Sequence, residues 1–215
     1  MVNHDSGITP PIKLSIDIFG KLLSNYNSDY QLKHDIFNEF AKVPEATPQT
    51  IAKVMRIAAS KSLSDIKIVY DHFHTYIRPI KANIIKCMIE ASTERDDIES
   101  LDYLFDLAGT KPNPHHQTLN PRDLIPNLRS CSASILSHFI DKGYINVDTN
   151  TRELIDLVDW ACEQIRLDII KVVHQRCLTQ TQIRRYLPKV GSINKAAECN
   201  HYKSLSYLFE GNELG

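Results

Sequence analysis

Apolar residues along this chain recur at the spacing of α-helices, in segments that repeat about every 34–35 residues. One apolar stripe, at positions i, i+3, i+7 and i+10, comprises Ile98, Leu101, Phe105 and Ala108. No stretch alternates apolar and polar residues for long enough to predict a sheet, and only 7 glycines occur. The pattern therefore predicts an all-α protein.

Each repeating unit predicts two helices joined by a short turn. A pair of small residues ends the first helix, polar-rich residues follow, and a second amphipathic helix then begins. The clearest small pairs are Ala58-Ala59, Ala161-Cys162 and Ala196-Ala197. A single hairpin of this kind cannot bury its apolar face without neighbours, so the self-similarity predicts stacked helical-hairpin repeats. We expect about five to six units.

Capping signals set the predicted boundaries. Thr47-Pro48 and Asn120-Pro121 each predict an N-cap followed by proline at the first helical position. Asn150 to Glu153 and Thr179 to Gln182 have the spacing of a capping box. The main predicted helices are 15–27, 29–42, 48–60, 63–77, 81–92, 96–108, 134–142, 150–164, 166–176, 193–199 and 202–210.

We expect three parts along the chain. Residues 1–14 form a loose leader, residues 15–45 form an N-terminal helical pair or cap, and residues 46–215 form the repeat stack. Residues 110–120 contain two prolines and are predicted to be a long loop between units. In the unit after that loop, Asn127-Leu128 stands where other units have small residues, so this unit departs from the pattern.

The charge balance argues against a nucleic-acid partner. The chain has 25 basic and 26 acidic residues, a formal net charge of −1, whereas nucleic-acid binding needs a basic face. The densest basic segment is Lys189 to Lys195 with Arg184-Arg185, which we interpret as a solvated helix face.

Cysteine usage and the N-terminus bear on the compartment. Five cysteines at wide spacing, without a Cys-x-x-Cys motif, favour free thiols in a reducing compartment over a disulfide framework. The first residues lack a basic region followed by an apolar run, so we expect no secretory signal. No stretch approaches the roughly 18 apolar residues of a membrane span. We therefore expect a cytoplasmic location.

Candidate chemistry is sparse. On a helix, His72 and His74 would point about 200° apart, so they would not share a metal ion. His115-His116 lies in the predicted loop without a nearby cysteine. No glycine-rich phosphate loop, nucleophile elbow or His-Glu-x-x-His motif occurs. We therefore expect no enzyme activity, no metal, no cofactor and no small-molecule substrate.

Several segments resemble ankyrin repeats. They are the connector Lys142-Gly-Tyr-Ile-Asn-Val-Asp148, the copy from Ala161 to Cys177 and the copy from Ala196 to Phe209. No unit has the family's Thr-Pro-Leu-His tetrapeptide, and the predicted helix 150–164 is long for an ankyrin unit. Another α-solenoid, of tetratricopeptide-like or unclassified hairpin type, is the alternative.

The resemblance implies a non-catalytic module that binds another protein through its concave face or loop tips. Such divergent chains are similar to those of bacterial effectors and large viruses, which implies action in a host-cell cytosol. The residues expected near the loops, and proposed to bind the partner, are Tyr76, Arg78, His115, His116, Tyr144 and Arg152. The alternatives are a small enzyme or enzyme inhibitor with a Cys/His site near residues 110–120, and a part of a larger machine.

The stripe through residues 98–108 generates a test of the predicted core. Replacing Leu101 or Phe105 with alanine is expected to lower the free energy of unfolding by about 3 kcal/mol, because each side chain fills the core. Thermal melts measure the change, and an unaltered melting temperature for either variant would contradict its placement.

Overall fold

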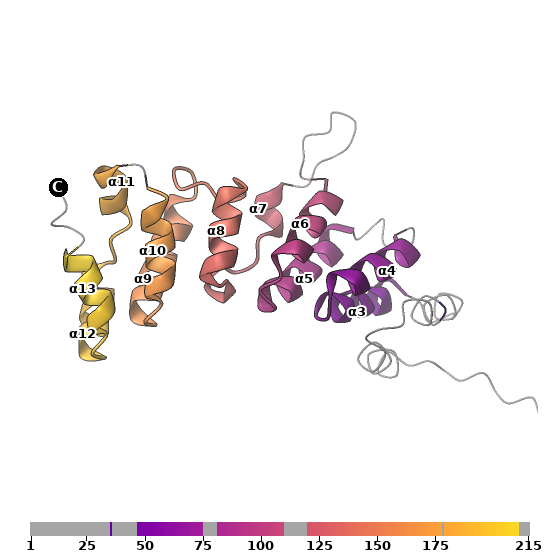
Figure 1. The fold of residues 1–215 in the computed structure, drawn as a ribbon, viewed down its shortest axis with the longest axis horizontal. Coiled ribbons are helices and arrows are strands. Elements are labelled where there is room, and N and C mark those ends of the chain that lie inside the picture. Colours follow the sequence, from indigo (N-terminus) through magenta and orange to yellow (C-terminus); the bar gives the residue numbers. More distant parts are fainter. Residues whose placement is uncertain (1–34, 36–46, 75–80, 110–119, 178, 211–215) are drawn as a thin grey trace, which may run out of the picture. The chain divides into compact units, whose positions relative to one another are not determined.

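The computed structural model describes residue 35 and residues 47–74, 81–109, 120–177 and 179–210. Regular structure in these residues is helical throughout, without a strand (Figure 1). The prediction of an all-α protein is therefore confirmed for the described part of the chain. None of the helices found there combines the length and apolar character that a bilayer crossing requires. The chain divides into two compact units, residues 1–80 and 81–215.

In the first unit, α3 (Pro48–Ala59) packs against α4 (Leu63–Phe73). The predicted cap of α3 is confirmed, because the Thr47 hydroxyl accepts a hydrogen bond from the Thr50 amide and Pro48 occupies the first turn. Ala58 is fully buried where α3 ends. The predicted helices within residues 15–45 lie outside the described residues, as do the expected last residues of the helix 63–77.

The second unit contains a succession of helices. They are α5 (Lys81–Glu94), α6 (Ile98–Leu107), α7 (Pro121–Leu124), the 3-10 helix η2 (Leu128–Ser130), α8 (Ala133–Asp141), α9 (Thr151–Glu163), α10 (Leu167–Gln175), α11 (Gln180–Arg185), α12 (Val190–Glu198) and α13 (Tyr202–Glu210). Three hairpins pack internally: α5 with α6, α9 with α10, and α12 with α13. Between hairpins, α9 contacts α12 and α10 contacts α8.

The same turn closes the first helix of all three hairpins. Asp96, Ile165 and Asn200 have φ of 58°, 62° and 60°, in the left-handed region. In each turn the amide of the following residue donates to the carbonyl five residues back, the bond of a Schellman motif. These bonds are Asp97 to Ser92 (3.1 Å), Arg166 to Ala161 (2.9 Å) and His201 to Ala196 (2.9 Å). The three turns are 69 and 35 residues apart.

Small buried residues lie directly before these turns. Ser92, Ala161 and Ala196 are fully buried at equivalent positions, 69 and 35 residues apart. A larger side chain there would hold the two helices of a hairpin apart. Cys162, the second member of its small pair, is also fully buried, whereas its equivalent Ala197 is exposed.

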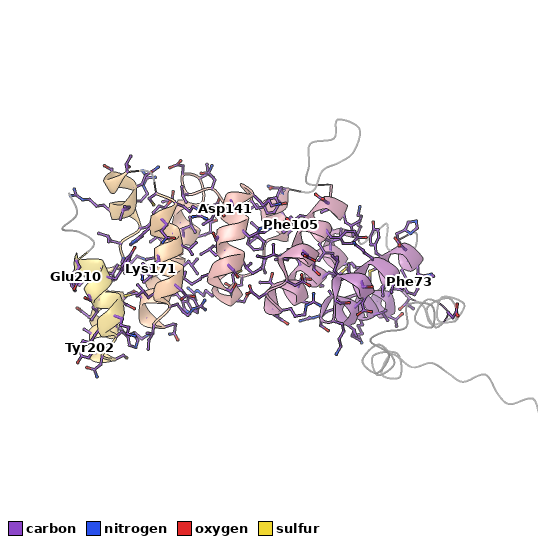
Figure 2. All side chains as sticks on the ribbon, viewed as in Figure 1. Phe73, Phe105, Asp141, Lys171, Tyr202 and Glu210 are labelled. Atoms are coloured by element: carbon purple, nitrogen blue, oxygen red, sulfur yellow. The ribbon has the colours of Figure 1, made fainter. Side chains whose placement is uncertain are left out.

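The predicted core stripes are confirmed in part. Leu101 and Phe105 are fully buried, and the Phe105 ring meets Phe139 of α8 edge-on at 5.8 Å between centroids. Figure 2 labels Phe105 among the packed side chains of α6. The prediction for the last stripe was wrong at Phe209, which is 63% exposed on α13. In the same helix, Leu208 is buried.

The two predicted capping boxes have different outcomes. At α11 the box is complete, since Thr179 accepts from the Gln182 amide and Gln182 accepts from the Thr179 amide. At α9 the prediction was wrong, because the Asn150 side chain makes no cap bond to the helix. Its carbonyl oxygen instead accepts from the Asn146 amide at 2.9 Å, which closes the preceding turn.

Polar side chains join each hairpin or helix of the second unit to the next. Their pairs are Asp102 with His138 (3.0 Å), Asp141 with Arg176 (2.8 Å), Glu163 with Lys195 (2.6 Å) and Asp159 with the Lys189 amide (2.6 Å). These partners are 36, 35, 32 and 30 residues apart along the chain. These contacts join α6 to α8, α8 to the end of α10, and α9 to α12 or the residue before it.

The shared turn predicts an unusual stabilising substitution. Ile165 is β-branched, 58% exposed and left-handed, a conformation that asparagine adopts at lower cost. Replacing Ile165 with asparagine is expected to raise the free energy of unfolding by about 1 kcal/mol, as measured by urea unfolding. The reciprocal change Asn200→Ile, at the equivalent turn, is the control and is expected to lower stability. A destabilised Ile165→Asn variant would contradict the turn assignment.

Candidate binding groove

A break in the helical pattern creates a groove in the second unit. Where the other hairpins have a long first helix, residues 121–130 form the four-residue α7, an extended stretch and the three-residue η2. Pro126 explains the break, because proline pushes the preceding residue out of the helical region. Ile125 accordingly has φ −65° and ψ 130°. The sequence marked this segment only through its missing small pair, and it did not predict the short helices found here.

Local hydrogen bonds fix the broken segment. The Asn120 side chain accepts from the Arg122 amide at 3.1 Å, which caps α7. The Asn127 side chain accepts from the Arg129 amide at 3.1 Å, which caps η2. Asparagine suits both positions because its short side chain reaches a backbone amide two residues on.

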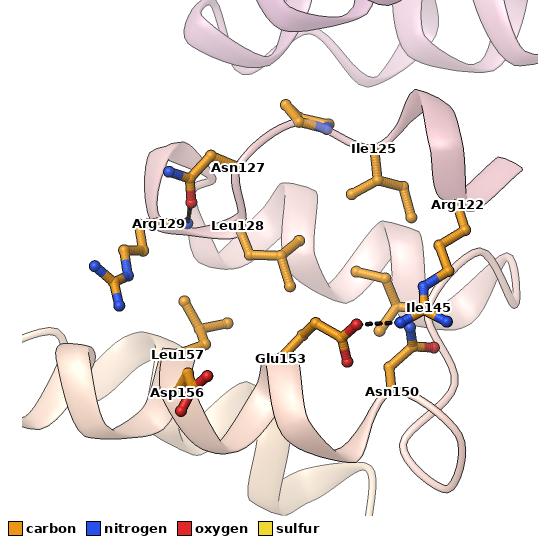
Figure 3. Close-up of a pocket in the computed structure, with 11 residues that line it drawn as sticks. Arg122, Ile125, Asn127, Leu128, Arg129, Ile145, Asn150, Glu153, Asp156 and Leu157 are labelled. Atoms are coloured by element: carbon orange, nitrogen blue, oxygen red, sulfur yellow. Dashed lines mark hydrogen bonds and ion pairs between the residues drawn. The ribbon is translucent and has the colours of Figure 1, made fainter.

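The groove lies between this segment and α9, with a volume of about 460 Å³ (Figure 3). Its lining residues are Arg122, Ile125, Pro126, Asn127, Leu128, Arg129, Ile145, Asn150, Glu153, Asp156 and Leu157. Figure 3 shows four apolar side chains that point toward one another and form the floor of the groove, those of Ile125, Leu128, Ile145 and Leu157. Ile145 and Leu157 are each 2% exposed, so the accessible apolar surface of the groove comes mainly from half-buried Ile125 and Leu128.

Charged side chains stand at both ends of the apolar floor. At one end Arg122 forms an ion pair with Glu153 of α9. A backbone hydrogen bond and the Arg122 guanidinium hold the pKa of Glu153 below its usual value. Toward the other end, Asp156 lies 3.6 Å from the ammonium group of Lys189. Arg122 and Glu153 thus neutralise each other, whereas Lys189 is shared between Asp156 and Asp159, which lies closer to it at 2.7 Å.

Arg129 is the exception among the charged residues that line the groove. Its side chain is exposed, and within the described part of the chain its guanidinium has no hydrogen-bond or ion-pair partner. A guanidinium presents five donors in a fixed fork that matches a carboxylate. The groove therefore offers an apolar floor beside one cation that is available to a ligand.

Of the residues predicted from the sequence to bind a partner, only Tyr144 and Arg152 are within the described residues. Tyr76, Arg78, His115 and His116 lie outside the described residues. Tyr144 is half-buried, and its ring stacks on Phe105 with 4.2 Å between centroids, so it packs at the edge of the core. Arg152 is exposed on the first turn of α9, next to Glu153, but it does not line the groove.

Cysteine chemistry finds little support in the described residues. Burial raises the pKa of Cys131 to about 12, despite the Arg166 guanidinium near it. Burial also raises the pKa of Cys162 and of Cys177, so their thiols stay protonated at neutral pH. The same part of the chain contains no group of three or more His, Cys, Asp or Glu side chains arranged to hold a metal ion.

The basic segment near the C-terminal hairpin is largely paired. Lys189 lies 2.7 Å from Asp159, and Lys195 lies 2.6 Å from Glu163. The interpretation of this segment as a solvated face agrees with these contacts. Arg184 and Arg185 remain exposed on α11.

Sequence reasoning missed the groove, although a signal for it was present. Pro126 follows five residues after the helix-starting Pro121, which leaves too little room for a full first helix. The register of Leu128 and Arg129 could not be derived from that signal, because it depends on how the extended stretch packs against α9.

Comparisons with protein-family models, with curated proteins and with solved structures found no match to this chain. The likeness to ankyrin repeats thus rests on the residues named above.

Burial of the thiols generates a test of cysteine reactivity. In the folded protein at pH 8, a thiol reagent is expected to modify exposed Cys199 and to leave Cys131 and Cys162 unmodified. Mass spectrometry of peptides gives the order of labelling, and unfolding in urea should expose all thiols equally. Fast labelling of Cys131 in the folded chain would revive a nucleophilic role.

Proposed function

We propose that this protein is a stacked helical-repeat scaffold that binds a segment of another protein in the groove between residues 121–130 and α9. In such a stack each unit contacts only its neighbours. The recurrent turns at Asp96, Ile165 and Asn200 support this architecture. So do the polar links between residues 30 to 36 positions apart.

The observation that carries the proposed binding role is the groove at the interrupted unit. Its apolar floor suits hydrophobic side chains, and the exposed Arg129 suits a carboxylate. A protein segment with an apolar residue near an acidic one meets both requirements. Among the described residues, no His, Cys, Asp and Glu side chains form a metal-binding group of three, and burial raises the pKa of the Cys131 thiol.

Variants of the groove test the proposal. Protein captured from source cells by the wild-type chain is identified by mass spectrometry, purified and titrated against each variant. Leu128→Asp removes part of the apolar floor, and Arg129→Glu reverses the available charge. Each is expected to raise Kd at least about tenfold, because both residues would contact the partner.

Arg184→Glu serves as the matched control, because Arg184 is an exposed arginine away from the groove. It is expected to leave Kd unchanged. Thermal melts of all three variants establish that they remain folded. Equal affinity of the groove variants and the control would overturn the proposed binding site.

A further inference from the structure

The hairpin of α12 and α13 carries an apolar stripe that is largely exposed among the described residues, 47–74, 81–109, 120–177 and 179–210. On α13, Tyr202 is 71% exposed and Phe209 is 63% exposed, and Leu205 between them is half-buried. Their spacing of three and four residues places them on one face of the helix. On α12, Val190 is 73% exposed, one turn before Ile193 on the same face. We call these five residues the terminal stripe.

Three of the five equivalent positions in the preceding hairpin are buried, and the other two, Ile155 and Leu167, are half-buried. Residues 35 positions before Ile193, Leu205 and Phe209 are Val158, Ile170 and His174. Val158 and Ile170 are fully buried, and His174 is 7% exposed. The terminal stripe therefore repeats a face that is otherwise covered.

Contacts of the preceding hairpin show what covers such a face. Helix α12 packs on α9, and the His201 ring lies 3.4 Å from the Cys162 carbonyl. The Tyr207 ring of α13 stacks on His174 with 5.8 Å between centroids. A helical hairpin thus seats on this face, which indicates that the terminal stripe is shaped to receive another helical hairpin.

Charges on α13 indicate the identity and direction of that hairpin. Exposed Lys203 and Glu210 lie seven residues apart, so they flank the same edge of the terminal stripe near opposite ends of the helix. Figure 2 shows Tyr202, the neighbour of Lys203, and Glu210 at the two ends of α13. Antiparallel pairing of two α13 helices brings each Lys203 beside the Glu210 of the other copy. Parallel pairing would bring like charges together.

We propose that two copies of this chain associate through the terminal stripe, with their α13 helices antiparallel about a two-fold axis. Such an interface is isologous, since the same residues contribute from both copies. Tyr202 and Phe209 of one copy pack against Phe209 and Tyr202 of the other. This association is independent of the groove on residues 121–130.

Sedimentation equilibrium of the full chain tests the association. The mass is expected to rise with concentration from the 24.6 kDa of one chain to that of two chains, and to stop there. Phe209→Glu is expected to raise the dimer Kd about thirtyfold or more, because it places a charge at the centre of an apolar contact. Circular dichroism and thermal melts check that this variant keeps its fold.

Charge reversals distinguish the antiparallel arrangement from other contacts. Lys203→Glu and Glu210→Lys are each expected to weaken the dimer several-fold, and the double variant is expected to restore it. Ile165→Asn, which alters an exposed apolar residue outside the terminal stripe, is the control and should leave the dimer Kd unchanged.

Four outcomes would overturn the proposal. The first is a single-chain mass at every concentration, as expected if another protein or another part of the chain covers the stripe. The second is growth beyond two chains, as expected for head-to-tail stacking. The others are a dimer that survives Phe209→Glu, and a double charge reversal that fails to restore association.

Discussion

Close approach of the two helices of each hairpin is the constraint on which the second unit depends. It requires a small buried residue in the last turn of the first helix and a residue in the left-handed conformation four positions later. Ser92, Ala161 and Ala196 meet the first requirement, and Asp96, Ile165 and Asn200 meet the second. A bulky residue at the first position would separate the helices and uncover the stripe that the second helix buries. The apolar core follows from this geometry.

Polar contacts between units then fix the register. Asp102 of α6 contacts His138 of α8, and Asp141 of α8 contacts Arg176 at the end of α10. The Arg176 guanidinium lowers the pKa of Asp141, as Lys195 lowers that of Glu163. The side chains of Asp102, Asp141 and Glu163 are 38%, 55% and 28% exposed, so solvent screens each pair and each contributes little stability. Their regular spacing instead favours one alignment of neighbouring hairpins over a shifted one.

Local signals in the sequence predicted much of the fold. The start of α3 after Thr47-Pro48, the cap of α11 and the extent of α13 depend on residues close in the chain, and the structure agrees with them. Asn150 misled because its side chain could bond either forward to the helix or backward to Asn146, and spacing does not choose between them. Phe209 misled because periodicity shows which face of a helix is apolar but not whether anything covers it.

The groove was harder to foresee than the fold. Pro126 signals that a helix stops, but the position of Arg129 relative to Leu157 depends on packing between segments about thirty residues apart. The binding residues first proposed were chosen for their nearness to loops. Nearness to a loop does not show how a side chain packs, and the Tyr144 ring stacks on Phe105 and lies near Phe139.

Ile165 has a wider implication. A β-branched residue with positive φ is unfavourable by itself, so its neighbours impose this conformation upon it. Aspartate, isoleucine and asparagine all occupy the same bend in this protein. The packed helices on either side thus set the backbone conformation of these turns, and residues of different types can occupy them. The residue type at such a turn is therefore a poor guide to its conformation.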